Sequence, residues 1–197
     1  MGSLELEKNT NLKHIASNYL SLSPITLEDN SFIFSLRHQK EGIYLKAPPV
    51  TLEQQIAYYH TYLDKYHQGE EIYYKIYDNV QERYCGVVRL TELHDQFYFN
   101  WQSLIVDPLC SPQIGIDIMM VIYSVGFEVL GREMCGPWVV DRHNLKTMKI
   151  HHYMDLTENI KSDQEYFYLQ VPRARFLKNA ERMKKRGFGV LKFPTIN

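Results

Sequence analysis

The sequence predicts an α/β fold built on a mixed, mostly antiparallel central sheet. Three observations support this prediction. Strand-like segments flank a short turn at residues 79–82, which indicates an antiparallel hairpin. Apolar residues within 114–129 repeat at helical spacing and separate two further strand-like segments. A strand, a helix and a second strand in this order form a right-handed crossover, so we expect one parallel strand pair inside the otherwise antiparallel sheet.

The first expected elements are a strand and a helix. The strand should end near Ile25. The helix that follows should be capped by Thr26 or Asp29, because short oxygen-bearing side chains accept hydrogen bonds from the first free backbone N–H groups of a helix.

The second helix has the clearest boundaries. Thr51 and Gln54 form a capping box at its start, and Gly69 ends it. Its predicted buried face consists of apolar residues at helical spacing: Leu52, Ile56, Tyr59 and Leu63.

The remaining elements follow from alternation, helical spacing and breakers. Pro108 should end the third strand of the antiparallel set, and Gly131 should end the long helix. The predicted strands are 70–78, 83–93, 96–106, 134–141 and 165–171, and a short helix is expected within 143–154. The basic segment 178–197 should be a helix with a loose tail.

Length, composition and charge restrict the class of protein. A chain of 197 residues with 45% hydrophobic and 23% charged residues is typical of one globular domain, here 1–197. The net charge of −1 argues against a general nucleic-acid binder. No apolar run is long enough for a membrane span, and the start lacks the shape of a secretory signal. The three cysteines match neither a disulfide framework nor a zinc site, so we expect a cytoplasmic protein without a bound metal.

The segment "SPQIGID" lies between a strand and the long helix. One interpretation is mechanical, since the chain must turn there. The other is chemical, because the turn and the first helical residues expose backbone N–H groups that together can bind an anion. The residues alone leave both interpretations open.

The chain resembles the GNAT superfamily of acyl-CoA N-acyltransferases in the order of its elements over about residues 23–171, with a basic extension at 172–197. The segments that carry the resemblance are "FSLRHQKEGIYLKAPPVTLEQQIAYY", "YCGVVRLTEL" before "NWQSLIVDP", and "VVDRHNLKTMKIHHY". Within the superfamily it looks most like the branch of ribosomal-protein and nucleotide-linked amino-sugar N-acetyltransferases. The usual phosphate-loop pattern is reduced here to Gln113 and Gly115.

The resemblance implies that acetyl-CoA, as co-substrate, lies between two splayed parallel strands, with helices on both faces of the sheet. The residues implied in cofactor binding are the main chains of Leu104, Ile105 and Val106, the N–H groups of Gln113, Ile114, Gly115, Ile116 and Asp117, and Asn144. The Asp117 side chain should point away from an anion. Asn144 has an equally good interpretation as a helix cap.

The resemblance also suggests catalytic residues. His151 occupies the place where relatives carry a tyrosine that protonates the departing thiolate, and Tyr153 is the substitute. An imidazolium would donate readily at neutral pH, and the alternative is that both residues lie on the exposed side of a short helix. Glu92 and His94 are the candidates for the general base. A backbone N–H near Leu104 would stabilise the oxyanion.

The implied acceptor site contains Arg37, His38, Tyr44, Lys46 and Trp101. Arg37 and Lys46 could bind a nucleotide diphosphate or instead cover acidic surface, and a tryptophan in a central strand is commonly core. The leading hypothesis is therefore transfer of an acetyl group to a primary amine of a small or nucleotide-linked sugar, by direct attack in a ternary complex. The alternatives are acetylation of a protein N-terminus and a catalytically silent acyl-CoA-binding module. A homodimer is possible.

Overall fold

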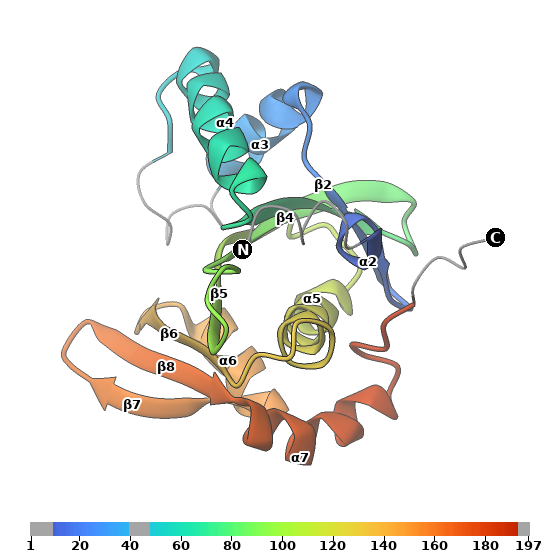
Figure 1. Ribbon diagram of the computed structural model, residues 1–197, viewed down its shortest axis with the longest axis vertical. Coiled ribbons are helices and arrows are strands. Elements are labelled where there is room, and N and C mark those ends of the chain that lie inside the picture. The colour runs from blue at the N-terminus through green and yellow to red at the C-terminus, as the bar shows by residue number, and fades with distance from the viewer. Residues whose placement is uncertain (1–9, 40–47, 193–197) are drawn as a thin grey trace.

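The computed structural model describes residues 10–39 and 48–192. Its eight strands form one sheet in the order β1-β2-β3-β4-β5-β6-β8-β7. Only β5 and β6 run parallel, and every other neighbouring pair is antiparallel. Helices α3 and α4 lie on one side of this curved sheet, and α5, α6 and α7 lie on the other (Figure 1). The predicted mixed α/β fold with helices on both faces is confirmed.

The N-terminal strand was predicted, but it is the second strand of the chain. A short helix α2 (Thr10–Lys13) leads into β1 (Ile15–Ala16), which pairs with β2 (Leu20–Pro24). A strand of two residues has no readable alternation, so the sequence did not reveal β1. Ala16 also bridges to Lys192, which brings the C-terminal segment against this edge.

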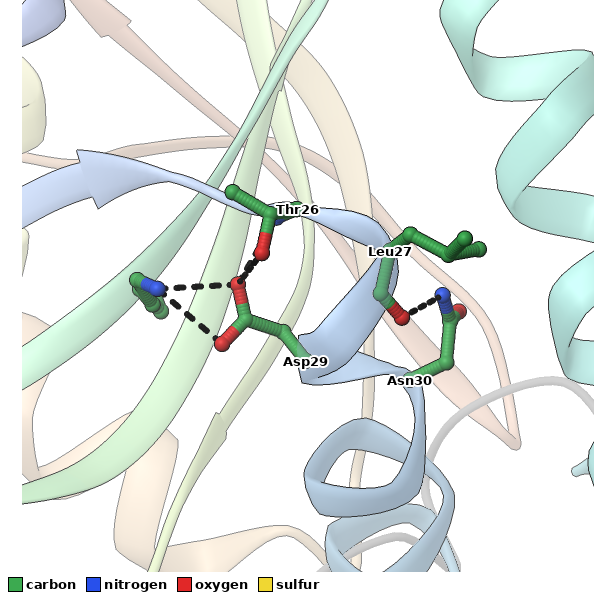
Figure 2. Close-up of polar contacts among 5 residues, drawn as sticks. Thr26, Leu27, Asp29 and Asn30 are labelled. Carbon is green, nitrogen blue, oxygen red and sulfur yellow. Dashed lines mark hydrogen bonds and ion pairs between the residues drawn. The ribbon is translucent and has the colours of Figure 1, made fainter.

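Both predicted cap residues act together after β2. A 3₁₀ turn (Leu27–Asp29) leads into α3 (Asn30–Arg37). The Asp29 carboxylate accepts hydrogen bonds from Thr26 N at 2.7 Å and Thr26 Oγ1 at 3.1 Å, as Figure 2 shows for the side chains. Lys75 of β3 forms an ion pair with the same carboxylate at 2.9 Å. This ion pair links the start of α3 to the sheet.

Helix α4 (Leu52–His67) begins and ends as predicted. Thr51 Oγ1 accepts from Gln54 N at 3.3 Å, and Gly69 has the positive φ of 75° that a helix end often requires. The buried face of α4 differs in part from the face predicted from the sequence. Tyr59 is buried as expected, but the other buried positions are Gln55 and Tyr62, because both find hydrogen-bond partners inside.

The antiparallel set is β3 (Ile72–Asp78), β4 (Arg83–Thr91) and β5 (Tyr98–Val106). The turn at residues 79–82 joins β3 to β4, as the sequence predicted. β5 ends before Pro108, also as predicted.

The long helix has two parts. Regular α5 (Ile114–Ser124) continues as a π-helical turn (Val125–Val129), and Gly131 follows with a φ of 67°. At Gly126 a Cβ atom would lie 2.1 Å from Cζ of Phe99, so the close approach of helix and strand requires glycine there.

The C-terminal part contains β6 (Met134–Asp141), α6 (Leu145–Met154), β7 (Glu158–Ser162), β8 (Tyr166–Pro172) and α7 (Arg173–Lys184). β7 was not predicted, because its polar and largely exposed residues lack the apolar alternation of a half-buried strand. α7 begins earlier than expected, directly after β8. The predicted tail at 193–197 lies outside the described residues.

Two apolar cores lie on opposite faces of the sheet. The larger contains α5, its π turn and α7, and the smaller packs α3 and α4 against β3, β4 and β5. Any site between β5 and β6 therefore has one face toward α5 and α6 and the other toward α3 and α4.

Candidate functional site

The parallel strands β5 and β6 pair briefly and then separate. Their two residue pairs are Tyr98–Met134 and Phe99–Cys135. Beyond them, β5 continues to Val106 bonded only to β4, and β6 continues to Asp141 bonded only to β8. Each strand thus keeps an unpaired backbone edge facing the other. This opening, which we call the V, matches the splayed parallel pair that the resemblance implied.

Two β-bulges accompany the opening. In β5, Ser103 and Leu104 face a single residue of β4, and Ser103 has a φ of 55°. In β6, Gly136 and Pro137 form a similar irregularity against β8. Because bulges bend a strand and increase its twist, they turn the two strands away from each other.

The predicted cofactor strand residues lie along this edge of β5. Ile105 is buried against the α3–α4 core, whereas Leu104 and Val106 pack against the core beside α5. Among the described residues, no strand pairs with this part of β5 on the side away from β4, so the backbone groups of the segment that point away from β4 face the V. An extended ligand can add to such an edge as a further strand.

His151 of α6 packs beside two tryptophans from the diverging strands. Its ring centroid is 6.4 Å from that of Trp101 in β5 and 5.7 Å from that of Trp138 in β6. The two tryptophans are 5.5 Å apart. His151 is only 1% exposed, so the alternative interpretation of an exposed residue is wrong for it.

The polar atoms of this cluster lack partners. Within the described chain, neither ring nitrogen of His151 has a hydrogen bond, and neither do the indole nitrogens of Trp101 and Trp138. The Tyr123 hydroxyl lies near Trp101 but completes no hydrogen bond with it, and burial raises the pKa of Tyr123. Buried polar groups normally have partners, so this part of the V is suited to bind a polar group.

The chemistry of the donors restricts that group. An indole N–H can only donate, so Trp101 and Trp138 require an acceptor such as a carbonyl oxygen. Burial lowers the pKa of His151 to about 4, so its imidazole is neutral at pH 7. The expected imidazolium at neutral pH is therefore corrected: the buried ring begins uncharged.

The turn between β5 and α5 is anchored by side chains from β3 and β4. Asp78 accepts hydrogen bonds from Ser111 N at 2.7 Å and Ser111 Oγ at 3.0 Å. Arg83 binds Asp107 at 2.9 Å, and Asp107 caps Leu109 N at 2.8 Å. These contacts hold the backbone before α5 in one conformation.

Two amides of this turn are available to a ligand. The N–H groups of Gln113 and Gly115 have no acceptor among the described residues. The other three predicted amides are used within the turn: Ile114 N donates to Ser111 O, and Ile116 N and Asp117 N donate to Gln113 O. Two of the five predicted amides are therefore free, and binding of a phosphate by this turn stays a prediction.

Asp117 points away from the turn, as expected. Its carboxylate is fully buried and accepts hydrogen bonds from Ser17 Oγ and, at 2.7 Å, from Gly189 N. Burial raises its pKa. Asp117 thus holds the N-terminal and C-terminal segments onto α5.

Asn144 caps α6, because its side chain accepts from Thr147 N at 3.2 Å. Near it, Ile150 approaches the start of α5, where a Cβ on Gly115 would lie 3.5 Å from Ile150 Cδ1. The middle of α6 therefore lies beside Gly115.

The remaining catalytic candidates lie away from the His151 cluster. Tyr153 is 41% exposed, and its hydroxyl accepts a hydrogen bond from Arg186, which follows α7. Glu92 and His94 are exposed in the turn between β4 and β5, at the closed end of the V. Glu92 has a φ of 61°.

The acceptor candidates divide between the two faces. Arg37 ends α3 and lies near Tyr73, where it lowers the pKa of a phenol that burial raises to about 12. His38 is exposed, and its Nδ1 donates to Phe34 O at 2.8 Å. Trp101 belongs to the opposite face, with α5 and α6. Tyr44 and Lys46 lie outside the described residues.

Sequence reasoning missed a polar network on the α3–α4 face. Arg89 of β4 contacts the hydroxyl of Tyr58, binds Gln102 Oε1 at 2.9 Å and lies 3.4 Å from Glu71. Trp138 was also missed. Only the place of Trp138 in a strand beside the crossover could have suggested a role for it. No pattern in the neighbouring sequence indicated a role for Arg89 or Asp78.

The described residues contain no group of three side chains arranged to hold a metal ion. Among the same residues, no helix has the length and apolarity needed to cross a membrane.

Comparison with solved structures identifies the fold as that of the GNAT N-acetyltransferases. A nucleotide-linked sugar GNAT, FdhC, is similar with a TM-score of 0.77 and 24% identity, over 89% of this chain and 98% of that one. A spermidine N-acetyltransferase SpeG chimera from Vibrio cholerae and hSSAT gives 0.66 and 15%, over 81% and 99%. Campylobacter jejuni N-acetyltransferase PseH gives 0.59 and 14%, over 78% and 98%. No family model and no curated protein sequence matches the chain.

Proposed function

We propose that the chain is an acetyl-CoA-dependent N-acetyltransferase whose co-substrate binds in the V. The observation that carries this proposal is the unpaired edge of β5, which leads to a turn with two free amides. The main chain of Leu104, Ile105 and Val106 would bind the pantetheine arm, and Gln113 and Gly115 would bind the pyrophosphate. The N-acetyltransferases that share the fold support the same reaction class.

His151 is the proposed proton donor to the departing thiolate. Because its imidazole is neutral before the reaction, it must first receive a proton, and the attacking amine has one to lose. In this route the amine nitrogen bonds to the acetyl carbon, the carbon–sulfur bond breaks, and His151 passes the proton to sulfur. A thiolate forming nearby would favour the imidazolium during this step.

The other roles remain as the resemblance assigns them. Leu104 N–H would stabilise the oxyanion, with the indole N–H groups of Trp101 and Trp138 as further donors in the same cluster. Glu92 and His94 are the candidate bases that would deprotonate an acceptor ammonium before attack. Asn144 would act mainly by capping α6 beside the cofactor.

The proposed acceptor is a primary amine of a small molecule, with a nucleotide-linked amino sugar as the leading class. FdhC is described as a nucleotide-linked sugar GNAT, which supports this class. Arg37 lies on the α3–α4 face and is a candidate ligand for a diphosphate. Tyr44 and Lys46 are further candidates from the segment that follows α3.

An acceptor screen tests the proposal. The purified chain is incubated with acetyl-CoA and one amine at a time: a nucleotide-linked amino sugar, spermidine or a peptide with a free N-terminus. We expect chromatography to show free CoA and an acetylated nucleotide sugar. Acetylation of the peptide alone would favour an N-terminal acetyltransferase. Binding of acetyl-CoA without turnover on any amine would favour a silent binding module.

A further inference from the structure

Two cysteines that are distant in sequence lie side by side next to the β5–α5 turn. Cys85 belongs to β4, and Cys110 belongs to the turn itself. Asp107 N donates to Cys85 O at 2.7 Å and Cys110 N donates to Asp107 O at 3.1 Å, so the backbones are joined through one residue. Their side chains are close enough for each thiol to shift the pKa of the other.

The two thiols differ in accessibility. Cys85 is fully buried, whereas Cys110 is partly exposed. A small oxidant in solvent can therefore reach the sulfur of Cys110 first. Cys135, the third cysteine, is fully buried in β6 and belongs to the core beside α5.

The interaction between the two thiols also shifts their pKa values in opposite directions. It is the largest cause that lowers the pKa of Cys110 and the largest that raises the pKa of Cys85. Cys110 is therefore the more readily ionised thiol of the pair, and it is also the more accessible one. The charged groups that also act on the pair are Lys146 and Arg83, which favour a thiolate, and Asp78 and Asp107, which oppose it.

We propose that Cys110 is a peroxide-reactive thiol and that Cys85 resolves it to an intramolecular disulfide. The Cys110 thiolate attacks hydrogen peroxide, which is reduced as its O–O bond breaks, and yields a sulfenic acid and hydroxide. The Cys85 thiol then attacks the Cys110 sulfur. An S–S bond forms, the S–OH bond breaks, and water leaves with the Cys85 proton.

The disulfide would act on the turn that carries the free amides of Gln113 and Gly115. A disulfide holds its two sulfurs about 2.05 Å apart, closer than two thiols that are not bonded to each other, so oxidation pulls Cys110 toward β4. This consequence rests on the proposed function, because it assumes that the amides bind acetyl-CoA. We expect oxidised protein to bind acetyl-CoA at least about fivefold more weakly than reduced protein.

The first experiment treats the full chain with stoichiometric hydrogen peroxide and maps its cysteines by peptide mass spectrometry. We expect a Cys85–Cys110 cross-linked peptide, a mass lower by two hydrogen atoms, full reversal by dithiothreitol, and unmodified Cys135. An unchanged mass, a cross-link that involves Cys135, or disulfides only between chains would overturn the proposal.

Two variants assign the roles. Cys85→Ala removes the resolving thiol, so Cys110 should accumulate as a sulfenic acid that dimedone traps. Cys110→Ser should leave Cys85 unmodified under the same treatment. Oxidation of Cys85 in that variant at the wild-type rate would contradict the assignment of Cys110 as the reactive thiol.

Titration with acetyl-CoA separates this proposal from the function. If the disulfide forms and reduced protein does not bind acetyl-CoA, the proposed function fails while the cysteine chemistry stands. If the disulfide forms but reduced and oxidised protein bind acetyl-CoA equally, the two cysteines are redox-active as proposed. The proposal that their disulfide weakens binding at the turn is then refuted.

Discussion

Protonation of His151 affects the packing of the V, because its ring is buried beside two indoles and has no hydrogen-bond partner among the described residues. Burial lowers its pKa in the folded chain to about 4 from an ordinary 6.5. Between these values the unfolded chain binds the proton more readily. The free energy of unfolding must therefore fall as the pH drops from about 6.5 toward 4.

A His151→Phe variant tests this linkage. Phenylalanine fills a similar volume and does not titrate, so wild type should lose about 2 kcal/mol more unfolding free energy than the variant between pH 7 and pH 5. Urea denaturation at the two pH values measures the difference. Equal losses in both proteins would mean that His151 is hydrated or paired in solution.

Turnover distinguishes the two proposed proton donors. His151→Phe should lower kcat by roughly 10²- to 10⁴-fold, the usual contribution of a general acid or base. Tyr153→Phe should have a much smaller effect, because the Tyr153 hydroxyl already contacts Arg186 near α7. A large loss in Tyr153→Phe with a small one in His151→Phe would transfer the role to Tyr153.

The role of a single residue could be predicted from the sequence only where it depends on neighbours in the same helix or strand. Thr51 and Gly69 act within one helix, and their roles were read correctly from adjacent residues. The burial of His151 depends on Trp138, which comes from a strand on the other side of a loop. No pattern inside the α6 segment could reveal that contact.

Among the elements, the π turn after α5 shows how a local irregularity serves packing. Gly126 allows the helix to approach Phe99 of β5, just where the V begins to open. The sequence predicted one continuous helix through this region. A π turn changes the backbone register without changing composition, so helical spacing alone could not distinguish it.

Gly126→Ala should destabilise the protein by about 1–3 kcal/mol, because the new Cβ would overlap the Phe99 ring. Thermal denaturation measures the loss. Gly115→Ala is a matched control from the same helix, since its Cβ would make an ordinary contact at 3.5 Å. The double variant Phe99→Leu/Gly126→Ala should lose less unfolding free energy than the two single variants lose together. Full additivity would rule out the overlap as the cause.

The β5–α5 turn owes its conformation to Asp78, which accepts four hydrogen bonds from Val80 N, Gln81 N, Ser111 N and Ser111 Oγ. Asp78→Asn replaces one acceptor oxygen with a donor. We expect a loss of roughly 2 kcal/mol in unfolding free energy and weaker binding of acetyl-CoA.

Asp95→Asn is the control for this change. Asp95 uses a single oxygen to cap Phe97 N and Tyr98 N, and asparagine keeps that oxygen. Urea denaturation should show little change in this variant. Equal destabilisation of both variants would contradict the special role of Asp78 at the turn.

For the whole molecule, the order of elements predicted the mixed sheet and its parallel pair. The resemblance, and not the residue pattern, supplied the expectation that this pair splays. The structure adds the reason, which is a bulge in each strand. Bulges depend on register between strands, so they could not be read from one strand at a time. The same limit applies to Cys85 and Cys110, which only the folded chain brings together.

The central claim is that the V and its turn bind acetyl-CoA, and isothermal titration of the purified chain tests it most directly. We expect micromolar binding by wild type and by Gly115→Ala. Gly115→Glu places a carboxylate beside the free amides of Gln113 and Gly115, so it should weaken binding by about tenfold or more. Absence of binding by wild type, or unchanged affinity in Gly115→Glu, would contradict the account.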